Sequence, residues 1–274
     1  MKLRGMSVVL ALAAVPSVAH ATWSVVALDR ATKRVVIGAA TCVTQGRFAG
    51  FPAQGLMDIQ AIVVPGVGIA AAQAGVDRTR ANQMLVYNEM KKGTHPSEIL
   101  KLLMADSSIQ SRQFGMVDMQ GRFAGFSGAR NGKASSSVQG QVMGTEVYYA
   151  IQGNILASNA VVQGAVRAFE AAQGTIEDRV MAAMDAAEAA GGDSRCTCAT
   201  TPRPQTALPC VTRTAHVAYL LAADSSDAAG VSFNDGKYSV YLNVTDENTT
   251  PQEDPSPVRT LRLRYDAWRK GGRR

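Results

Sequence analysis

The stretch that constrains the fold most is TWSVVALDRATKRVVIGAATCV, residues 22–43. Residues 22–28 and 34–43 are rich in Val, Ile and Thr, and the polar segment Asp29-Arg30-Ala31-Thr32-Lys33 separates them. Apolar, β-branched runs divided by a short polar break are typical of two antiparallel strands. The sequence therefore predicts a β-hairpin that begins at Thr22.

The residues before this hairpin have the features of a secretory signal peptide. Lys2 and Arg4 supply a positive start, residues 6–18 are almost wholly apolar, and Ala19-His20-Ala21 has the small-x-small form of a cleavage site. The apolar run is shorter than the roughly 20 residues that a membrane-spanning helix needs. We therefore expect signal peptidase to remove residues 1–21.

Cleavage after Ala21 would leave 253 of the 274 residues and lower the formal net charge from +6 to +4. A chain of this length fits one domain with a sizeable core. We expect residues 22–274 to form a single exported domain, periplasmic or secreted, without stable membrane insertion. The basic C-terminal stretch, residues 259–274, is interpreted as a solvated helix face rather than as a nucleic-acid site.

Further along the chain, predicted strands alternate with predicted pairs of helices. The strands are expected at 61–64, 67–73, 113–118, 122–127, 146–152, 214–222 and 238–244. The helices are expected at 78–92, 96–104, 159–173, 176–190 and 258–269, with Thr94, Ser158 and Thr175 as candidate N-caps. This order favours a layered α+β fold of antiparallel sheets with helices on their outer faces, rather than a doubly wound parallel sheet.

The cysteines are Cys42, in an apolar run, and Cys196, Cys198 and Cys210, which surround a Pro-rich segment. Export permits disulfides, so the cluster predicts a stapled loop, although four cysteines allow three connectivities. Zinc is an alternative because His216 follows Cys210, but the spacing matches no familiar structural site. We expect disulfides, with no metal and no organic cofactor.

Thr22 has a specific chemical meaning once it is N-terminal. An N-terminal threonine carries a hydroxyl nucleophile and a base, its own α-amine, in one residue. The α-amine has a pKa near 8, so a useful fraction is neutral at pH 7. The alternative is that signal peptidase merely tolerates a small polar residue there. Thr22 also begins a predicted strand, which would hold the new terminus in place.

Several segments resemble the family called domain of unknown function 1028. They are Thr22-Trp23-Ser24-Val25-Val26-Ala27, residues 112–118 with Gly121-Arg122, residues 149–156, and Gly191-Gly192-Asp193-Ser194-Arg195. That family is similar to the N-terminal nucleophile hydrolases. The resemblance implies a four-layer αββα sandwich of two antiparallel sheets flanked by helix pairs, with Thr22 as the candidate nucleophile.

The chain departs from the family pattern in two places. It inserts a Cys-bearing loop, about residues 196–213, and it has Gly75-Val76-Asp77 where an Asn-Pro pair is common. Both departures fall near predicted substrate-facing loops. They leave the specificity open.

Two groups of residues are candidates to assist Thr22. Gln152, Gly153 and Asn154 end a predicted strand, where an amide side chain, Asn154 above all, would donate a hydrogen bond to a developing oxyanion. Asp193 and Arg195 would orient the amine or bind a substrate carboxylate. The alternatives are that the amides cap a turn and that the charged pair holds the cysteine loop.

Ser24 lies two residues from Thr22 and would project from the same face of its strand, either to bond Thr22 or as an ordinary hydroxyl at the core edge. His95 and His216 have no local nucleophile partner and are interpreted as structural.

Two functions remain open. The first is a hydrolase of amide bonds in a small molecule or peptide, with a homodimer as a further expectation. The second is a non-catalytic binding or assembly protein of the cell envelope on the same fold. A cysteine-dependent redox or metal protein is disfavoured because the chain has no C-x-x-C pair.

Overall fold

Two antiparallel sheets form the centre of the fold in the computed structural model, which describes residues 22–51 and 53–271. The predicted signal peptide, residues 1–21, lies outside the described residues. The larger sheet has the strand order β10-β9-β2-β1-β8-β7. Its strands are β1 (Thr22–Asp29), β2 (Arg34–Thr41), β7 (Ser136–Gln141), β8 (Val147–Asn154), β9 (Val217–Ala223) and β10 (Val240–Val244).

The smaller sheet has the order β3-β4-β5-β6. Its strands are β3 (Ala61–Val64), β4 (Gly68–Ala74), β5 (Arg112–Asp118) and β6 (Phe123–Ser127). The predicted hairpins at 22–43, 61–73 and 113–127 are thereby confirmed. Strand β7 was not predicted, because Ser, Gln and Gly dominate its sequence SSVQGQ and none of its residues is buried.

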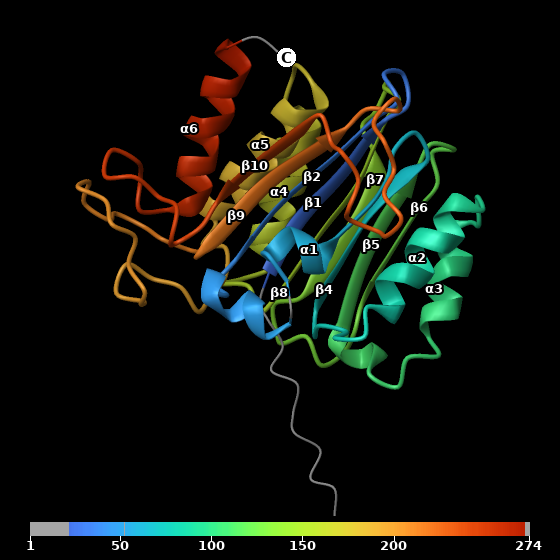
Figure 1. Cartoon of the computed structure of the whole chain (residues 1–274), viewed down its shortest axis with the longest axis horizontal. Helices are drawn as coiled ribbons and strands as arrows, with labels where there is room; N and C mark the ends of the chain where they lie inside the picture. The colour runs from blue at the N-terminus through green and yellow to red at the C-terminus, as the bar shows by residue number, and fades with distance from the viewer. Residues whose placement is uncertain (1–21, 52, 272–274) are drawn as a thin grey trace, which may run out of the picture.

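Helices cover the outer faces of both sheets (Figure 1). Against the larger sheet lie α4 (Ala160–Ala171), α5 (Ile176–Ala189) and α6 (Pro257–Lys270); against the smaller sheet lie α2 (Ala81–Lys91) and α3 (Pro96–Leu103). The shorter elements are η1 (Gln45–Gly50), α1 (Leu56–Gln60) and η2 (Ile109–Ser111), none of which was predicted. The expected α+β class with two antiparallel sheets is confirmed.

The core is divided by these layers into three clusters. One lies between the larger sheet and α4, α5 and α6, and includes Trp23 and Phe169. The second lies between the sheets and includes Val26 and Tyr219, and the third lies under α2 and α3. Strand β1 contributes to two of them, because alternate side chains point to opposite faces of a sheet. Its unbroken apolar run, rather than an alternating one, follows from burial on both faces.

Two of the predicted helix N-caps are wrong. The N-cap of α3 is His95 rather than Thr94, since the imidazole Nδ1 accepts a hydrogen bond from the Ser97 backbone N–H (3.1 Å). The flanking residue of α4 is Asn159 rather than Ser158. Thr175 caps α5 in a reciprocal capping box, as predicted. In the described part of the chain, none of the helices has the length and hydropathy that a membrane crossing needs.

Candidate functional site

Thr22 occupies the first position of a central strand. Strand β1 lies between β2 and β8, and Thr22 stands directly opposite Thr41 on one side and Asn154 on the other. Directly paired residues of antiparallel strands project from the same face of the sheet. The three side chains therefore form a row across three strands, all buried.

The hydroxyl of Thr22 is held in this row. Its Oγ1 donates a hydrogen bond to Thr41 Oγ1 (3.2 Å), which also accepts one from the backbone N–H of Val43 (3.2 Å). Only 3% of the surface of Thr22 is exposed. The start of β1 is thus fixed inside the sheet rather than frayed.

Gln73 of β4 ties the start of β1 to the smaller sheet. Its Nε2 donates to the backbone oxygen of Thr22 (3.1 Å) and to Gln113 Oε1 (2.7 Å). Its Oε1 accepts from Ser24 Oγ (2.8 Å) and from Gln60 Nε2 (2.7 Å). The groups in this network are all neutral, and they join the two sheets.

Sequence reasoning missed Gln73, Gln60 and Gln113. The signal that was present is a polar residue inside an otherwise apolar strand, GIAAAQA for β4. A buried amide must find hydrogen-bond partners, so its presence marks a polar contact across the core. The predicted neighbour Ser24 does belong to this network, through Gln73 rather than through Thr22.

The other predicted amides lie at different depths. Asn154 pairs with Thr22, whereas Gln152 pairs with Ser24, two residues deeper in the sheet. Gln152 Oε1 accepts from Ser137 Oγ (3.3 Å). The carbonyl oxygen of Gly153 accepts a hydrogen bond from Gln113 Nε2 (2.9 Å). Of these three residues, Asn154 is the one that lies directly opposite Thr22.

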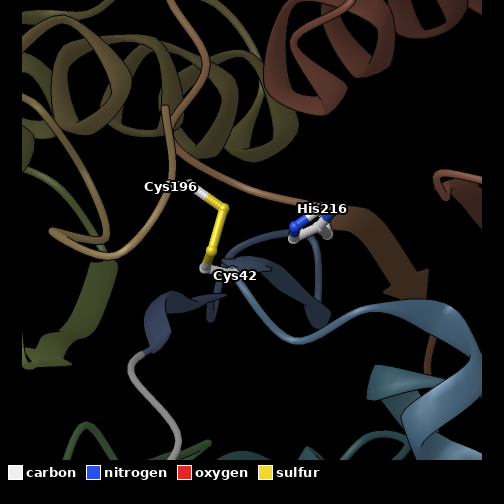
Figure 2. A group of neighbouring side chains, drawn as sticks. All are labelled: Cys42, Cys196 and His216. Carbon is white, nitrogen blue, oxygen red and sulfur yellow. A yellow bond between two sulfur atoms is a disulfide. The ribbon is translucent and has the colours of Figure 1, made fainter. Parts of the chain in front are cut away.

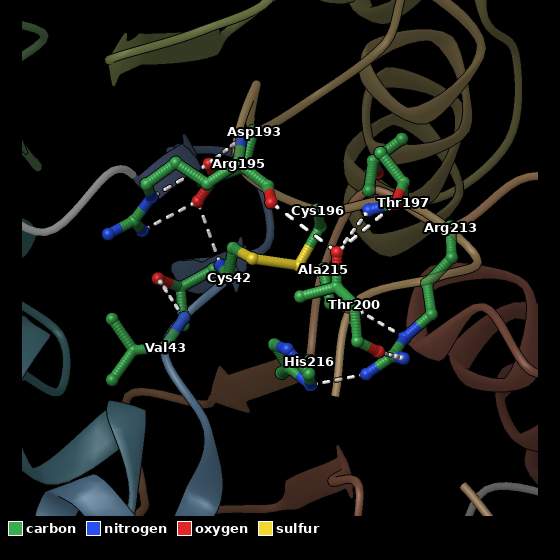
Figure 3. Close-up of a disulfide and its surroundings, with 12 residues drawn as sticks. Cys42, Val43, Asp193, Arg195, Cys196, Thr197, Thr200, Arg213, Ala215 and His216 are labelled. Carbon is green, nitrogen blue, oxygen red and sulfur yellow. Dashed lines mark hydrogen bonds and ion pairs between the residues drawn. A yellow bond between two sulfur atoms is a disulfide. The ribbon is translucent and has the colours of Figure 1, made fainter. Parts of the chain in front are cut away.

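Asp193 and Arg195 form an ion pair at the end of β2. Arg195 Nη2 lies 2.8 Å from Asp193 Oδ2, and the same carboxylate oxygen accepts from the backbone N–H of Cys42 (2.9 Å) (Figure 3). Asp193 is completely buried, while 32% of the Arg195 side chain is exposed. Because Cys42 follows Thr41, the carboxylate of Asp193 holds the chain just beyond the residue opposite Thr22.

The predicted stapled loop is present as two disulfides. Cys42 is bonded to Cys196, 154 residues away, and Cys198 to Cys210, 12 residues away. The second bond closes the loop on itself, and the first anchors the loop to the end of β2 (Figure 3). The loop is thus anchored one residue beyond Thr41, which lies opposite Thr22.

His216 lies beside the Cys42–Cys196 disulfide (Figure 2). One ligand atom from each of the three residues lies within 4.8 Å of the others. Metal binding there would require thiolates, and both sulfurs are held in the disulfide. The residues present therefore do not offer a metal site in this state.

The imidazole of His216 is buried among charged neighbours. Its Nδ1 contacts the guanidinium of Arg213 and lies 3.7 Å from Asp246 Oδ2. Burial, together with the positive charges of Arg213 and Arg195, lowers the pKa of His216 to about 4. The ring is neutral at pH 7, and its backbone N–H donates to the carbonyl of Thr41 (2.8 Å).

Comparison with known proteins yields a family and a related fold. The model of a family of unknown function, DUF1028, matches residues 22–230. The chain is also similar to the crystal structure of protein SPO2555 from Silicibacter pomeroyi, described as a DUF1028 protein, with a TM-score of 0.63 and 22% identity over 90% of this chain and 89% of that one. No curated protein matches the chain. The similarity of structure supports the fold alone.

Proposed function

The chain belongs to the DUF1028 family, and from that premise we propose that it is an exported hydrolase of amide bonds whose nucleophile is Thr22. The observation that carries the proposal is the place of Thr22 at the head of a central strand, opposite Thr41 and Asn154. Removal of residues 1–21 would give this fixed residue a free α-amine. The match to the family also begins at residue 22.

The fold supports the same proposal. Two face-to-face antiparallel sheets with helices on both outer faces are the arrangement expected of a four-layer αββα sandwich, and a nucleophile on the first strand of the inner layer would suit N-terminal nucleophile chemistry. The two disulfides are typical of proteins from oxidising compartments and support export.

The reaction would proceed through an acyl-enzyme. The α-amine takes the hydroxyl proton as Thr22 Oγ1 attacks the amide carbonyl carbon, and the C–N bond breaks as that proton passes to the leaving amine. Water then attacks the ester, gives a proton back to Thr22 Oγ1 through the amine, and releases the carboxylic acid. We assign Asn154 as the side-chain donor to the oxyanion, because it stands opposite the nucleophile.

Intact mass measurement of the exported protein, before and after treatment with a β-lactone, tests the proposal. We expect a chain that starts at Thr22 and gains one adduct, which Thr22→Ala loses entirely. Thr32→Ala is the matched control, because it removes the same side chain at the exposed turn of the same hairpin and should keep the adduct. A different mature N-terminus, or an adduct that persists in Thr22→Ala, would favour the non-catalytic envelope protein instead.

A further inference from the structure

Two neighbouring strand ends bring Cys42 and His216 together. Cys42 follows directly after β2 and His216 directly precedes β9, and the two strands pair with Thr41 opposite Val217. The backbone N–H of His216 also donates to the carbonyl of Thr41 (2.8 Å). The sheet thus fixes one sulfur and one imidazole at the same corner, and Figure 2 shows the ring beside the Cys42–Cys196 bond.

The Cys-bearing loop supplies a third group at this corner. The backbone N–H of Cys196 donates to the carbonyl of Asp193 (3.3 Å), and the carboxylate of Asp193 accepts from the backbone N–H of Cys42 (2.9 Å). These bonds keep Cys196 near Cys42 independently of the bond between their sulfurs. The two sulfurs and one nitrogen of His216 lie within 4.8 Å of one another. Cys196 and His216 are buried, whereas Cys42 is partly exposed and gives a small ion a route to the corner.

The two nitrogens of His216 have different surroundings. Nδ1 contacts Arg213 and lies 3.7 Å from Asp246 Oδ2, and Figure 3 shows the other nitrogen, Nε2, on the side of the ring that faces the disulfide. A histidine that binds a metal commonly donates its other N–H to a carboxylate, and Asp246 stands in that place. Arg213 does not depend on the imidazole, because it also donates to three backbone carbonyls.

The charged side chains around this corner balance one another. Asp193 pairs with Arg195, and Asp246 lies near His216 and Arg213, so two carboxylates face two guanidinium groups. The thiolates of two cysteines would therefore match the double charge of Zn²⁺ without leaving an excess. Neighbouring guanidinium groups also favour the thiolate over the thiol.

We infer that Cys42, Cys196 and His216 form a zinc site that exists only when their disulfide is reduced. A dithiol supplies the two electrons: the S–S bond breaks, the dithiol becomes a disulfide, and its two protons pass to the two cysteine sulfurs. Zn²⁺ then displaces both protons and binds the two thiolates and Nε2, with water in the fourth position. Thiolate and imidazole ligands select zinc over harder ions such as Mg²⁺.

The movement that this site requires is small. Ligand atoms around tetrahedral zinc lie about 3.5–3.8 Å apart, so the sulfurs separate and the ring approaches them by at most about 1 Å. Zinc would then hold the Cys-bearing loop to the end of β2 wherever thiols are kept reduced, as the disulfide does in an oxidising compartment. The inference does not depend on the proposed role of Thr22.

Cobalt titration tests the site in a protein that contains no other cysteines. Cys198→Ser with Cys210→Ser leaves only Cys42 and Cys196, and a phosphine reductant opens their bond without adding a competing thiol. We expect the reduced, folded protein to take up one Co²⁺ with the charge-transfer absorption of thiolate–cobalt bonds and the visible bands of a tetrahedral ion. Zn²⁺ should displace it. The same protein with its disulfide intact should take up none.

Substitutions at the imidazole and its carboxylate separate this site from simple binding to thiols. His216→Ala should weaken Co²⁺ binding at least about 100-fold, whereas His216→Cys should restore it with stronger charge-transfer absorption. Asp246→Asn should weaken binding about 10–100-fold, because it removes the charged acceptor next to Nδ1. Circular dichroism checks that each variant is folded.

The matched control is Cys42→Ser with Cys196→Ser, reduced in the same way. It keeps Cys198 and Cys210, which the loop also brings together, and should not give the spectrum of a tetrahedral thiolate site. The inference would be wrong if this control gave the same spectrum, if the reduced protein with Cys42 and Cys196 took up no Co²⁺, or if His216→Ala bound the ion as tightly.

Discussion

The β1–β2 hairpin ends in two different environments. At its open end, Thr22 and Thr41 face neutral amides and a small apolar cavity of about 20 Å³. At its turn, Arg34 lies in a charged cleft of about 560 Å³ that is also lined by Glu177 and Asp224. The larger and more charged of the two spaces is therefore the one farther from Thr22.

The charged side chains at the turn form ion pairs with one another. Arg34 contacts Glu177 directly, and its Nη1 lies 2.5 Å from Asp224 Oδ1. The exposed fractions of the Arg34 and Glu177 side chains are 11% and 1%. Such a pair joins β2 to the start of α5, which explains its position without any ligand. The volume and charge of a cleft therefore do not by themselves identify the chemistry of this molecule.

Removing the ion pair of Arg34 at the turn should have the largest effect on the free energy of unfolding. Arg34→Met leaves the buried carboxylate of Glu177 without its partner, and we expect a loss of about 3–5 kcal/mol in the free energy of unfolding. Urea denaturation measures this loss. The rate of β-lactone addition to Thr22 in the folded variant should not change.

The control for this variant is Arg30→Met, which removes the exposed ion pair with Glu146 on the same hairpin. We expect a much smaller loss of stability, because exposed pairs are screened by water. If Arg34→Met abolished the reaction of Thr22 in a folded protein, the separation of the two ends would be wrong.

Breaking the open end should affect both stability and reactivity. The double substitution Cys42→Ser with Cys196→Ser removes the bond that anchors the loop beside Thr41, and we expect a loss of about 2–4 kcal/mol. Because the same contact positions Cys42 against Asp193, acylation of Thr22 should slow several-fold. Thermal unfolding and intact mass against time measure the two effects.

The matched control is Cys198→Ser with Cys210→Ser, which opens the shorter loop away from β2. The stability should fall by less, since a 12-residue separation restricts the unfolded chain less than one of 154 residues. Equal slowing of acylation in both double variants would mean that the loop acts as a whole and that the Cys42 anchor has no special role.

Much of the open end of the β1–β2 hairpin could be predicted from the sequence. The first strand, its partner and the turn follow from local composition, and the position of Asn154 follows from a strand that ends at Gly153-Asn154. Thr41 was missed although the hairpin register contains it, because Asp29 opposite Arg34 places Thr22 opposite Thr41.

The partners across the sheets could not be predicted in the same way. Gln73 reaches Thr22 from the smaller sheet, and Cys196 reaches Cys42 across 154 residues. No local periodicity encodes such contacts, since they depend on how the two sheets stack and on where a loop returns. Four cysteines therefore predicted a stapled loop without predicting which pair would anchor it to β2.

Acid should weaken the open end through His216. Its pKa is about 4 in the folded protein and about 6.5 in an unfolded chain, so between these values the unfolded state binds a proton that the folded state does not. The stability that the neutral ring permits is fully present above pH 6.5 and is lost as the pH falls towards 4. The full shift corresponds to about 3 kcal/mol.

His216→Gln should remove this dependence, because an amide can still accept from Arg213 but does not titrate in this range. Urea denaturation at pH 7 and pH 4.5 would compare the two proteins. Burial raises the pKa values of Asp246 and Glu188, whose protonation acts in the opposite direction in both proteins, so the difference between wild type and variant isolates the imidazole. An acid loss of equal size in the wild type and in His216→Gln would assign it to a group other than the imidazole.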